Sequence, residues 1–308
     1  SEMCIRDSFT GISIATLAIS AISALAFGTV SASITKIDAF AGIDKRPDKK
    51  SSAINYLLVG SDTREGLTKA ELKELRVGSV ATAAGKRSDT MLLVHISKAR
   101  DKAVLVSIPR DTFALIPAHP NKAGKTIPAV HSKINSAFNW GGAPLLIQTI
   151  EEMTQLKIDH YVEVNFAGFA SVIDSLGGIE VCTKKDIDDP KSHLVLPAGV
   201  HTLNGIEALK YVRTREFDGM GDLGRMQRQQ AFMSSVLKKA TSAGVLLNPI
   251  TMTSFINSSL AAVTTDEGLK NSDLITLAKQ MKSLATSNVR TLTVPLSDLN
   301  YYANGVTA

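Results

Sequence analysis

The sequence predicts an α/β fold in which a central mixed β-sheet lies between two layers of helices, preceded by a transmembrane helix. Three observations favour it. Short apolar stretches with the two-residue alternation of strands recur along the chain, segments with helical spacing separate them, and a long uncharged stretch comes first. Strands interleaved with helices on this scale are typical of a three-layer α-β-α domain, and 308 residues allow one sizeable domain with an appendage.

The uncharged stretch covers residues 9–35 and reads FTGISIATLAISAISALAFGTVSASIT. A bilayer core needs roughly 20 apolar residues, so this stretch predicts a membrane anchor. A cleaved signal peptide is the alternative. Small residues that would suit a cleavage site are Ala24, Ala26, Ser31 and Ala32. Residues 1–8 continue no pattern found in the rest of the chain and are assigned to no element.

Residues 36–52 are polar, carry Pro47 and show no apolar periodicity, which is the composition of a juxtamembrane linker. The folded domain is therefore predicted to cover residues 53–308.

The first part of this domain predicts three strands. They are INYLLVG at 54–60, TMLLVHIS at 90–97 and AVLVSIP at 103–109, with KARDK as the turn between the last two. We expect these strands to share a sheet.

Helices and strands then alternate. Apolar residues at helical spacing predict a helix over 144–155, HYVEVN predicts a strand at 160–165, and a second helix over 166–176 should end at Gly177 and Gly178. Later elements are a strand at 179–182, helices at 204–211 and 224–240, two further helices and a strand at 289–295.

Polar clusters stand at the ends of the first three strands. Residues 60–64 (GSDTR) follow the first strand, 87–90 (RSDT) lead into the second, and 109–111 (PRD) follow the third. If the second strand runs antiparallel to the other two, all three clusters meet at one sheet edge.

A fourth cluster, at 211–229, alternates guanidinium and carboxylate groups. Arg225, Arg228 and Gln229 have the spacing of one helical face. Arginine binds phosphate oxygens with its planar fork and stays charged, so the four clusters indicate a site for more than one phosphate. The alternative for each cluster is a solvated surface with weak ion pairs.

Two carboxylates, Asp62 and Asp89, accompany these arginines at strand ends. Mg²⁺ is usually held by one or two carboxylates together with substrate phosphates, so a chelated pyrophosphate is expected here. The net charge of +5 suits an anionic partner. The six histidines lack the spacing of zinc ligands, and Ser61 and Ser107 have no paired base nearby in the sequence.

The motifs also resemble a known family. LLVGSDTR, RSDTMLLVHIS, VSIPRDT, KINSAFNWGG, VNFAGFASVIDSLGGIEV, LPAGVHTLNGIEALKYVRTR and GDLGRMQRQQ occur in order between about residues 55 and 239. Together they are similar to the LytR-CpsA-Psr family.

This resemblance implies a membrane protein, anchored by a single pass, with an extracytoplasmic catalytic domain. It implies transfer of a phosphoglycan (teichoic acid, capsule or arabinogalactan) from a polyprenyl-pyrophosphate carrier to a muramic-acid hydroxyl of peptidoglycan, with Mg²⁺ on the pyrophosphate. The motif order is shared by all these polymers, so the polymer stays open.

Site residues follow from the matching motif positions. The resemblance implies that Asp62 and Asp89 bind the metal and that Asp222 is an acid near the head group. The residues implied to bind the pyrophosphate are Arg87, Arg110, Arg213, Arg215, Arg225 and Gln229, and those implied to be catalytic are Arg87, Asp89, Arg110 and Asp222. Asp89 and Asp222 are both candidates for the general base. The segment between Asp62 and Arg87 reads as a lid or an insertion.

Three alternatives stay open at this stage. The apolar helices around 145–150 and 166–176 could wall a pocket for the lipid tail, or they could be ordinary core. The same site could hydrolyse lipid pyrophosphate instead of transferring it. A membrane-linked regulator that binds nucleic acid is disfavoured, because the arginines alternate with carboxylates that repel a phosphate backbone.

Overall fold

The structure is a computed structural model that describes residues 34–64, 67–75, 88–121, 123–214, 221–240, 242–246, 248–270, 273, 289–293, 302–303 and 306–307. The predicted anchor at 9–35 lies outside this part, apart from its last two residues. So do Arg87 and Arg215. Within the described part, no helix is both long and apolar enough to cross a membrane.

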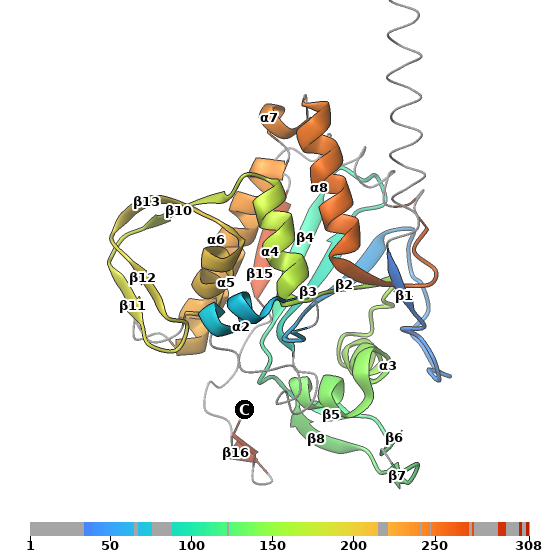
Figure 1. The fold of residues 1–308 in the computed structure, drawn as a ribbon. Coiled ribbons are helices and arrows are strands. Elements are labelled where there is room, and N and C mark those ends of the chain that lie inside the picture. The colour runs from blue at the N-terminus through green and yellow to red at the C-terminus, as the bar shows by residue number, and fades with distance from the viewer. Residues whose placement is uncertain are drawn as a thin grey trace, which may run out of the picture.

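A mixed β-sheet forms the centre of the molecule, as the sequence predicts (Figure 1). Its order is β1-β14-β9-β2-β3-β4-β15. The strands are β1 (Thr35–Ile37), β2 (Ile54–Ser61), β3 (Ser88–Ile96), β4 (Ala103–Ile108), β9 (His160–Val164), β14 (Val263–Asp266) and β15 (Val289–Thr293). β3 runs antiparallel to both β2 and β4, whereas β9 is parallel to β2 and β15 is parallel to β4.

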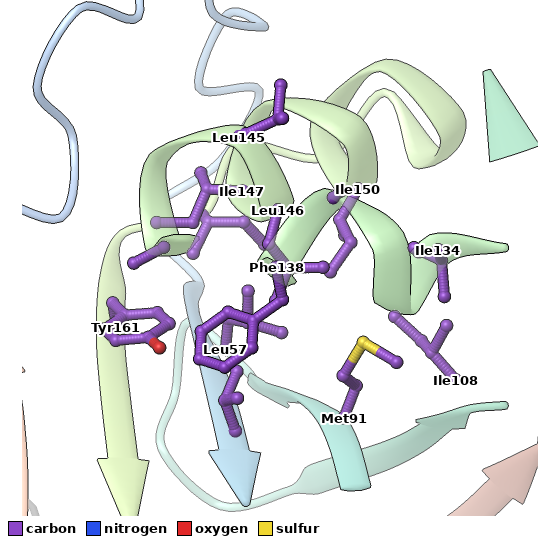
Figure 2. Packing of buried hydrophobic residues seen from close by; sticks show 14 of the residues in the cluster. Leu57, Met91, Ile108, Ile134, Phe138, Leu145, Leu146, Ile147, Ile150 and Tyr161 are labelled. Atoms are coloured by element: carbon purple, nitrogen blue, oxygen red, sulfur yellow. The ribbon is translucent and has the colours of Figure 1, made fainter. Parts of the chain in front are cut away.

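Helix α3 (Ile134–Thr154) packs against one face of this sheet and makes the first hydrophobic core (Figure 2). Leu57 and Met91 from the strands meet Phe138 and Leu146 from the helix, and all four are almost completely buried. The helix begins ten residues before the predicted 144–155 segment. Gly142 has a φ of 64°, so a kink separates two helical pieces, and the predicted segment corresponds to the second piece.

A second core lies among α4 (Phe166–Ser175), α5 (Gly205–Arg213), α6 (Gly221–Ala240), α7 (Ala243–Leu246), α8 (Pro249–Ala261) and the pairs β10–β13 (Ile179–Thr183, Gly199–Leu203) and β11–β12 (Ile187–Asp189, Leu194–Leu196). Two glycines allow these helices to approach closely. A Cβ on Gly168 would lie 2.4 Å from the Ala262 carbonyl oxygen, and one on Gly205 would lie 2.3 Å from that of Ala170. α4 therefore packs tightly against both α8 and α5.

The remaining elements are short. They are α2 (Lys69–Leu75), β5 (Phe113–Ile116), β6 (His119–Pro120), β7 (Thr126–Ile127), β8 (Val130–Lys133), β16 (Tyr302–Ala303) and β17 (Val306–Thr307). α2 falls in the segment read as a lid or an insertion, and Leu75 at its end packs against Leu209 of α5.

Residues 36–52, expected to form a linker, contact the domain along much of their length. β1 pairs in parallel with β14, and the Lys36 ammonium donates to the Thr265 hydroxyl (2.9 Å). Arg46 forms an ion pair of 2.7 Å with Glu151, whose side chain is 1% exposed. Structured chain therefore begins upstream of Ala53, because this polar segment finds its partners in distant parts of the fold.

Candidate functional site

The polar clusters of the first three strands meet at one edge of the sheet. Ser61, at the end of β2, is in register with Ser88, at the start of β3, and Ile108, at the end of β4, is in register with Met91. β3 runs antiparallel to β2 and β4, which is the condition under which the sequence placed these clusters together. β9 ends at the same edge, because Val164 is in register with Gly60.

A β-bulge lies at this edge. Gly60 pairs with Thr90 while Ser61 pairs with Ser88, which leaves Asp89 as the extra residue of β3. Bulges of this kind re-aim side chains and are frequent beside active sites. Asp62 follows Ser61 directly and is half-buried, so the two backbone positions predicted to carry metal ligands are neighbours. The Asp89 side chain lies outside the described residues.

Arg110 lies in a turn directly after β4. The Thr112 amide donates to the Pro109 carbonyl (3.0 Å) and closes the turn. The Arg110 Nε contacts Asp111 Oδ2 at 3.2 Å, and Lys133 Nζ contacts the other oxygen at 3.0 Å. Burial acts to raise the pKa of Asp111, but the two cations outweigh it and hold that pKa below its usual range. Asp111 is therefore an anion that fixes the position of Arg110.

Asn135 joins the Arg110 turn to the start of β3. Its side-chain Oδ1 accepts a hydrogen bond from the backbone N–H of Ser88 (3.0 Å), and its backbone N–H donates to the Arg110 carbonyl (3.1 Å). The sequence reasoning assigned no role to Asn135, although it lies within the KINSAFNWGG motif. An asparagine in the first turn of a helix that directly follows a strand was the available signal.

Arg213 reaches the same edge from the second core. It ends α5, and its guanidinium carbon lies 5.3 Å from the ring centroid of Phe166, within cation–π distance. Phe166 lies two residues after the end of β9, so this contact places Arg213 near that end.

Helix α6 holds the end of α5 in place. Gln229 Nε2 donates to the Val212 carbonyl (3.1 Å) and Arg228 Nη2 donates to the Thr214 carbonyl (2.5 Å). The last carbonyls of a helix lack intrahelical partners, so these bonds satisfy groups that are otherwise open. Arg228 and Gln229 thus position the backbone on either side of Arg213.

Arg225 is 3% exposed and Arg228 is 9% exposed. Arginine is almost never buried to this extent unless it is paired. The alternative of a solvated helix face is therefore wrong for these two residues. Asp222 belongs to the first turn of α6, with its side chain outside the described residues.

The helix predicted to wall a lipid pocket lies in the first hydrophobic core. Leu145, Leu146 and Ile150 are at most 5% exposed and belong to the first core, which agrees with the ordinary-core alternative. Among the residues that the structure describes, no group of three or more His, Cys, Asp or Glu side chains is arranged to hold a metal ion.

The comparison with known proteins decides the family, because the profile of the LytR_cpsA_psr family matches residues 25–308. The chain belongs to this family. The probable cell wall biosynthesis protein LcpB of Corynebacterium glutamicum is 36% identical over 255 residues, covering 83% of this chain and 57% of that protein. The polyisoprenyl-teichoic acid–peptidoglycan teichoic acid transferase TagT of Bacillus subtilis is 35% identical over 204 residues, covering 64% of this chain and 56% of that protein.

Among solved structures, the crystal structure of B. subtilis TagV matches with a TM-score of 0.62 and 28% identity, covering 84% of this chain and 91% of that one. TagT bound to LIIa-WTA matches with a TM-score of 0.60 and 27% identity, covering 87% and 90%. The mixed α/β fold of the LytR-CpsA-Psr family is thereby confirmed. The chain spans little more than half the length of the curated relatives it matches.

Proposed function

We propose that this protein transfers a phosphoglycan from a polyprenyl-pyrophosphate carrier to peptidoglycan and leaves a phosphodiester between wall and polymer. The observation that carries the proposal is the meeting of Asp62, Asp89 and the Arg110 turn at one sheet edge, with Arg213 brought to it through Phe166. Membership of the family and the names of the relatives support it.

In this reaction the acceptor hydroxyl attacks the glycan-proximal phosphorus, the bond to the bridging oxygen breaks, and polyprenyl phosphate leaves. Arg110 and Arg213, with Arg87, Arg215 and Arg225, would hold the pyrophosphate and stabilise the charge that develops on its oxygens. Asp111 and Lys133 keep Arg110 in position, while Gln229 does the same for the end of α5. Asp89 or Asp222 would take the proton of the hydroxyl.

The residues at the bulge suit Mg²⁺. Asp62 and Asp89 come from neighbouring backbone positions, and such an ion needs only one or two carboxylates when phosphate oxygens complete its shell. When bound, Mg²⁺ would neutralise charge on the pyrophosphate.

The proposal extends to the arrangement of the whole chain. Residues 9–35 would anchor it in the cell membrane by a single pass, and the catalytic domain, with helices on both faces of its sheet, would lie outside the cytoplasm. Polyprenyl-linked glycan, peptidoglycan and membrane lipid are the partners that this arrangement implies, and nucleic acid is not one.

The test uses the full chain in detergent with a polyprenyl-pyrophosphate-linked glycan, peptidoglycan oligomers and Mg²⁺. Mass spectrometry should detect an acceptor-dependent phosphodiester product, and Arg110→Ala should abolish it. Arg100→Ala is the matched control, because Arg100 lies in the β3–β4 turn at the opposite edge of the sheet. Pyrophosphate cleavage without transfer would identify a hydrolase instead, and equal turnover in the two variants would refute the assigned site.

A further inference from the structure

A cavity of about 390 Å³ lies between the β6–β7 hairpin and the first helical piece of α3. Its volume falls within the roughly 300–1,000 Å³ of small-molecule sites. Its lining residues are His119, Asn121, Ile127, Val130, Asn139 and Trp140. None of the site residues predicted from the sequence belongs to this set.

Helix α3 contributes residues both to the cavity and to the proposed active site. Asn139 follows Asn135 by four residues, which is about 6 Å along a helix axis and on the same face. Asn135 in turn holds the start of β3 and the Arg110 turn. The first turns of α3 therefore connect this cavity to the residue that holds the reacting edge.

The aromatic part of the cavity is built around Trp140. Its ring stacks on that of His119, with centroids 5.5 Å apart and planes 13° apart, yet Trp140 remains 42% exposed. His119 is only 7% exposed and therefore supports the indole from the protein side. Ile127 and Val130 add aliphatic surface beside it. The result is a rigid apolar platform that water reaches.

The polar part offers both donors and acceptors. The Pro117 carbonyl accepts from His119 Nδ1 (2.9 Å), and a carbonyl only accepts, so neutral His119 carries its proton on Nδ1 and leaves Nε2 as an acceptor. Asn121 Oδ1 accepts from the amides of Ala123 and Lys125, which leaves its NH₂ group to donate. The side-chain amide of Asn139 makes no hydrogen bond to the residues that the structure describes.

We infer that this cavity binds a pyranose ring of the wall glycan that accepts the transferred polymer. A pyranose presents an apolar C–H face, which fits Trp140, and a rim of hydroxyl and acetamido groups, which pair with amides and an imidazole acceptor. The lining side chains carry no fixed charge, so a sugar ring fits better than a phosphate-rich donor chain. A polyprenyl tail would desolvate the two asparagine amides without replacing their hydrogen bonds. The inference deepens the proposed transferase function and rests on it.

Trp140 is the only tryptophan of the chain, so its fluorescence reports on this cavity alone. The full chain in detergent is titrated with a β-1,4-linked tetrasaccharide of alternating N-acetylglucosamine and N-acetylmuramic acid. We expect a saturable change in emission that a carrier-free teichoic acid does not produce. Asn139→Ala should raise the Kd about three- to tenfold, the equivalent of one lost hydrogen bond. Val195→Ala, at an exposed position of β12, should leave the Kd unchanged.

Kinetics separate this inference from the proposed function. Trp140→Ala should raise the KM for the tetrasaccharide roughly tenfold, whereas kcat at saturating acceptor and the affinity for donor should stay near wild type, and Trp140→Phe should restore most of the loss. Loss of all turnover in wild type would refute the transferase and leave the fluorescence titration to test the cavity. An unchanged KM in Trp140→Ala, or a response to teichoic acid alone, would overturn the assignment of the cavity.

Discussion

Replacing Asn135 by alanine tests whether this side chain holds the active-site edge together. The change removes the acceptor of the Ser88 amide, a bond of 3.0 Å at a residue that is 0% exposed. An unsatisfied buried donor costs about 1–3 kcal/mol, so the free energy of unfolding should fall by that amount. The backbone bond from Asn135 to the Arg110 carbonyl should remain.

Urea unfolding of Asn135→Ala measures this cost, and the transfer assay measures its effect on the site. Asn135→Asp keeps an oxygen acceptor and should recover most of the stability. Glu152→Ala, at an exposed position of the same helix, is the control and should change stability by less than about 0.5 kcal/mol. Two results would refute the reasoning: a loss in Asn135→Ala no larger than in Glu152→Ala, or an Asp variant as unstable as the Ala variant.

Two further predictions concern stability. Arg46→Ala leaves the Glu151 carboxylate buried without its cation, and removal of one partner from such a pair costs about 3–5 kcal/mol in urea unfolding. Burial acts to raise the pKa of Asp266, but hydrogen bonds from His160 (3.3 Å) and the Tyr161 amide (2.8 Å) lower it by more. The carboxylate therefore stabilises the fold above its unfolded pKa of about 3.9 and loses this contribution as pH falls through its lower folded pKa. Asp266→Asn should consequently be less stable than wild type at pH 7, with a flatter stability profile below about pH 4.

Controls for these variants come from exposed positions. Lys49→Ala removes a 2.6 Å ion pair with Asp159, but Lys49 is 41% exposed and the expected cost is below about 1 kcal/mol. If Arg46→Ala costs no more than Lys49→Ala, the buried pair contributes nothing special to the fold. If Asp266→Asn follows the wild-type profile in acid, another carboxylate controls acid unfolding.

The sequence was informative about strands and about the edge they share. Alternating apolar residues gave β2, β3 and β4, and one assumption about the direction of β3 was enough to bring Asp62, Asp89 and Arg110 to the same edge. Gly177 and Gly178 end α4 as expected, with φ of 74° and 84°. These features depend on neighbouring residues in the chain, so the order of residues was enough to predict them.

Other features depend on contacts between distant parts of the chain. The bulge at Asp89 is a matter of register with β2, and the roles of Asn135 and Lys133 exist only once α3 is seated beside the Arg110 turn. The binding of 36–52 to the domain depends on Glu151, more than 100 residues later. The cavity at Trp140 needs a hairpin folded over a helix. No periodicity in the sequence encodes any of them.

The proposed metal and phosphate ligands are divided between two hydrophobic cores. Asp62 and Arg110 follow strands of the first core, whereas Arg213 and Arg225 belong to helices of the second. Their separation is thus set by how buried apolar residues seat one core against the other. Over evolutionary time, exchange of a few buried leucines or phenylalanines can change the distance between the ligands on the two cores and so fit the site to a different head group. Every charged residue can stay the same.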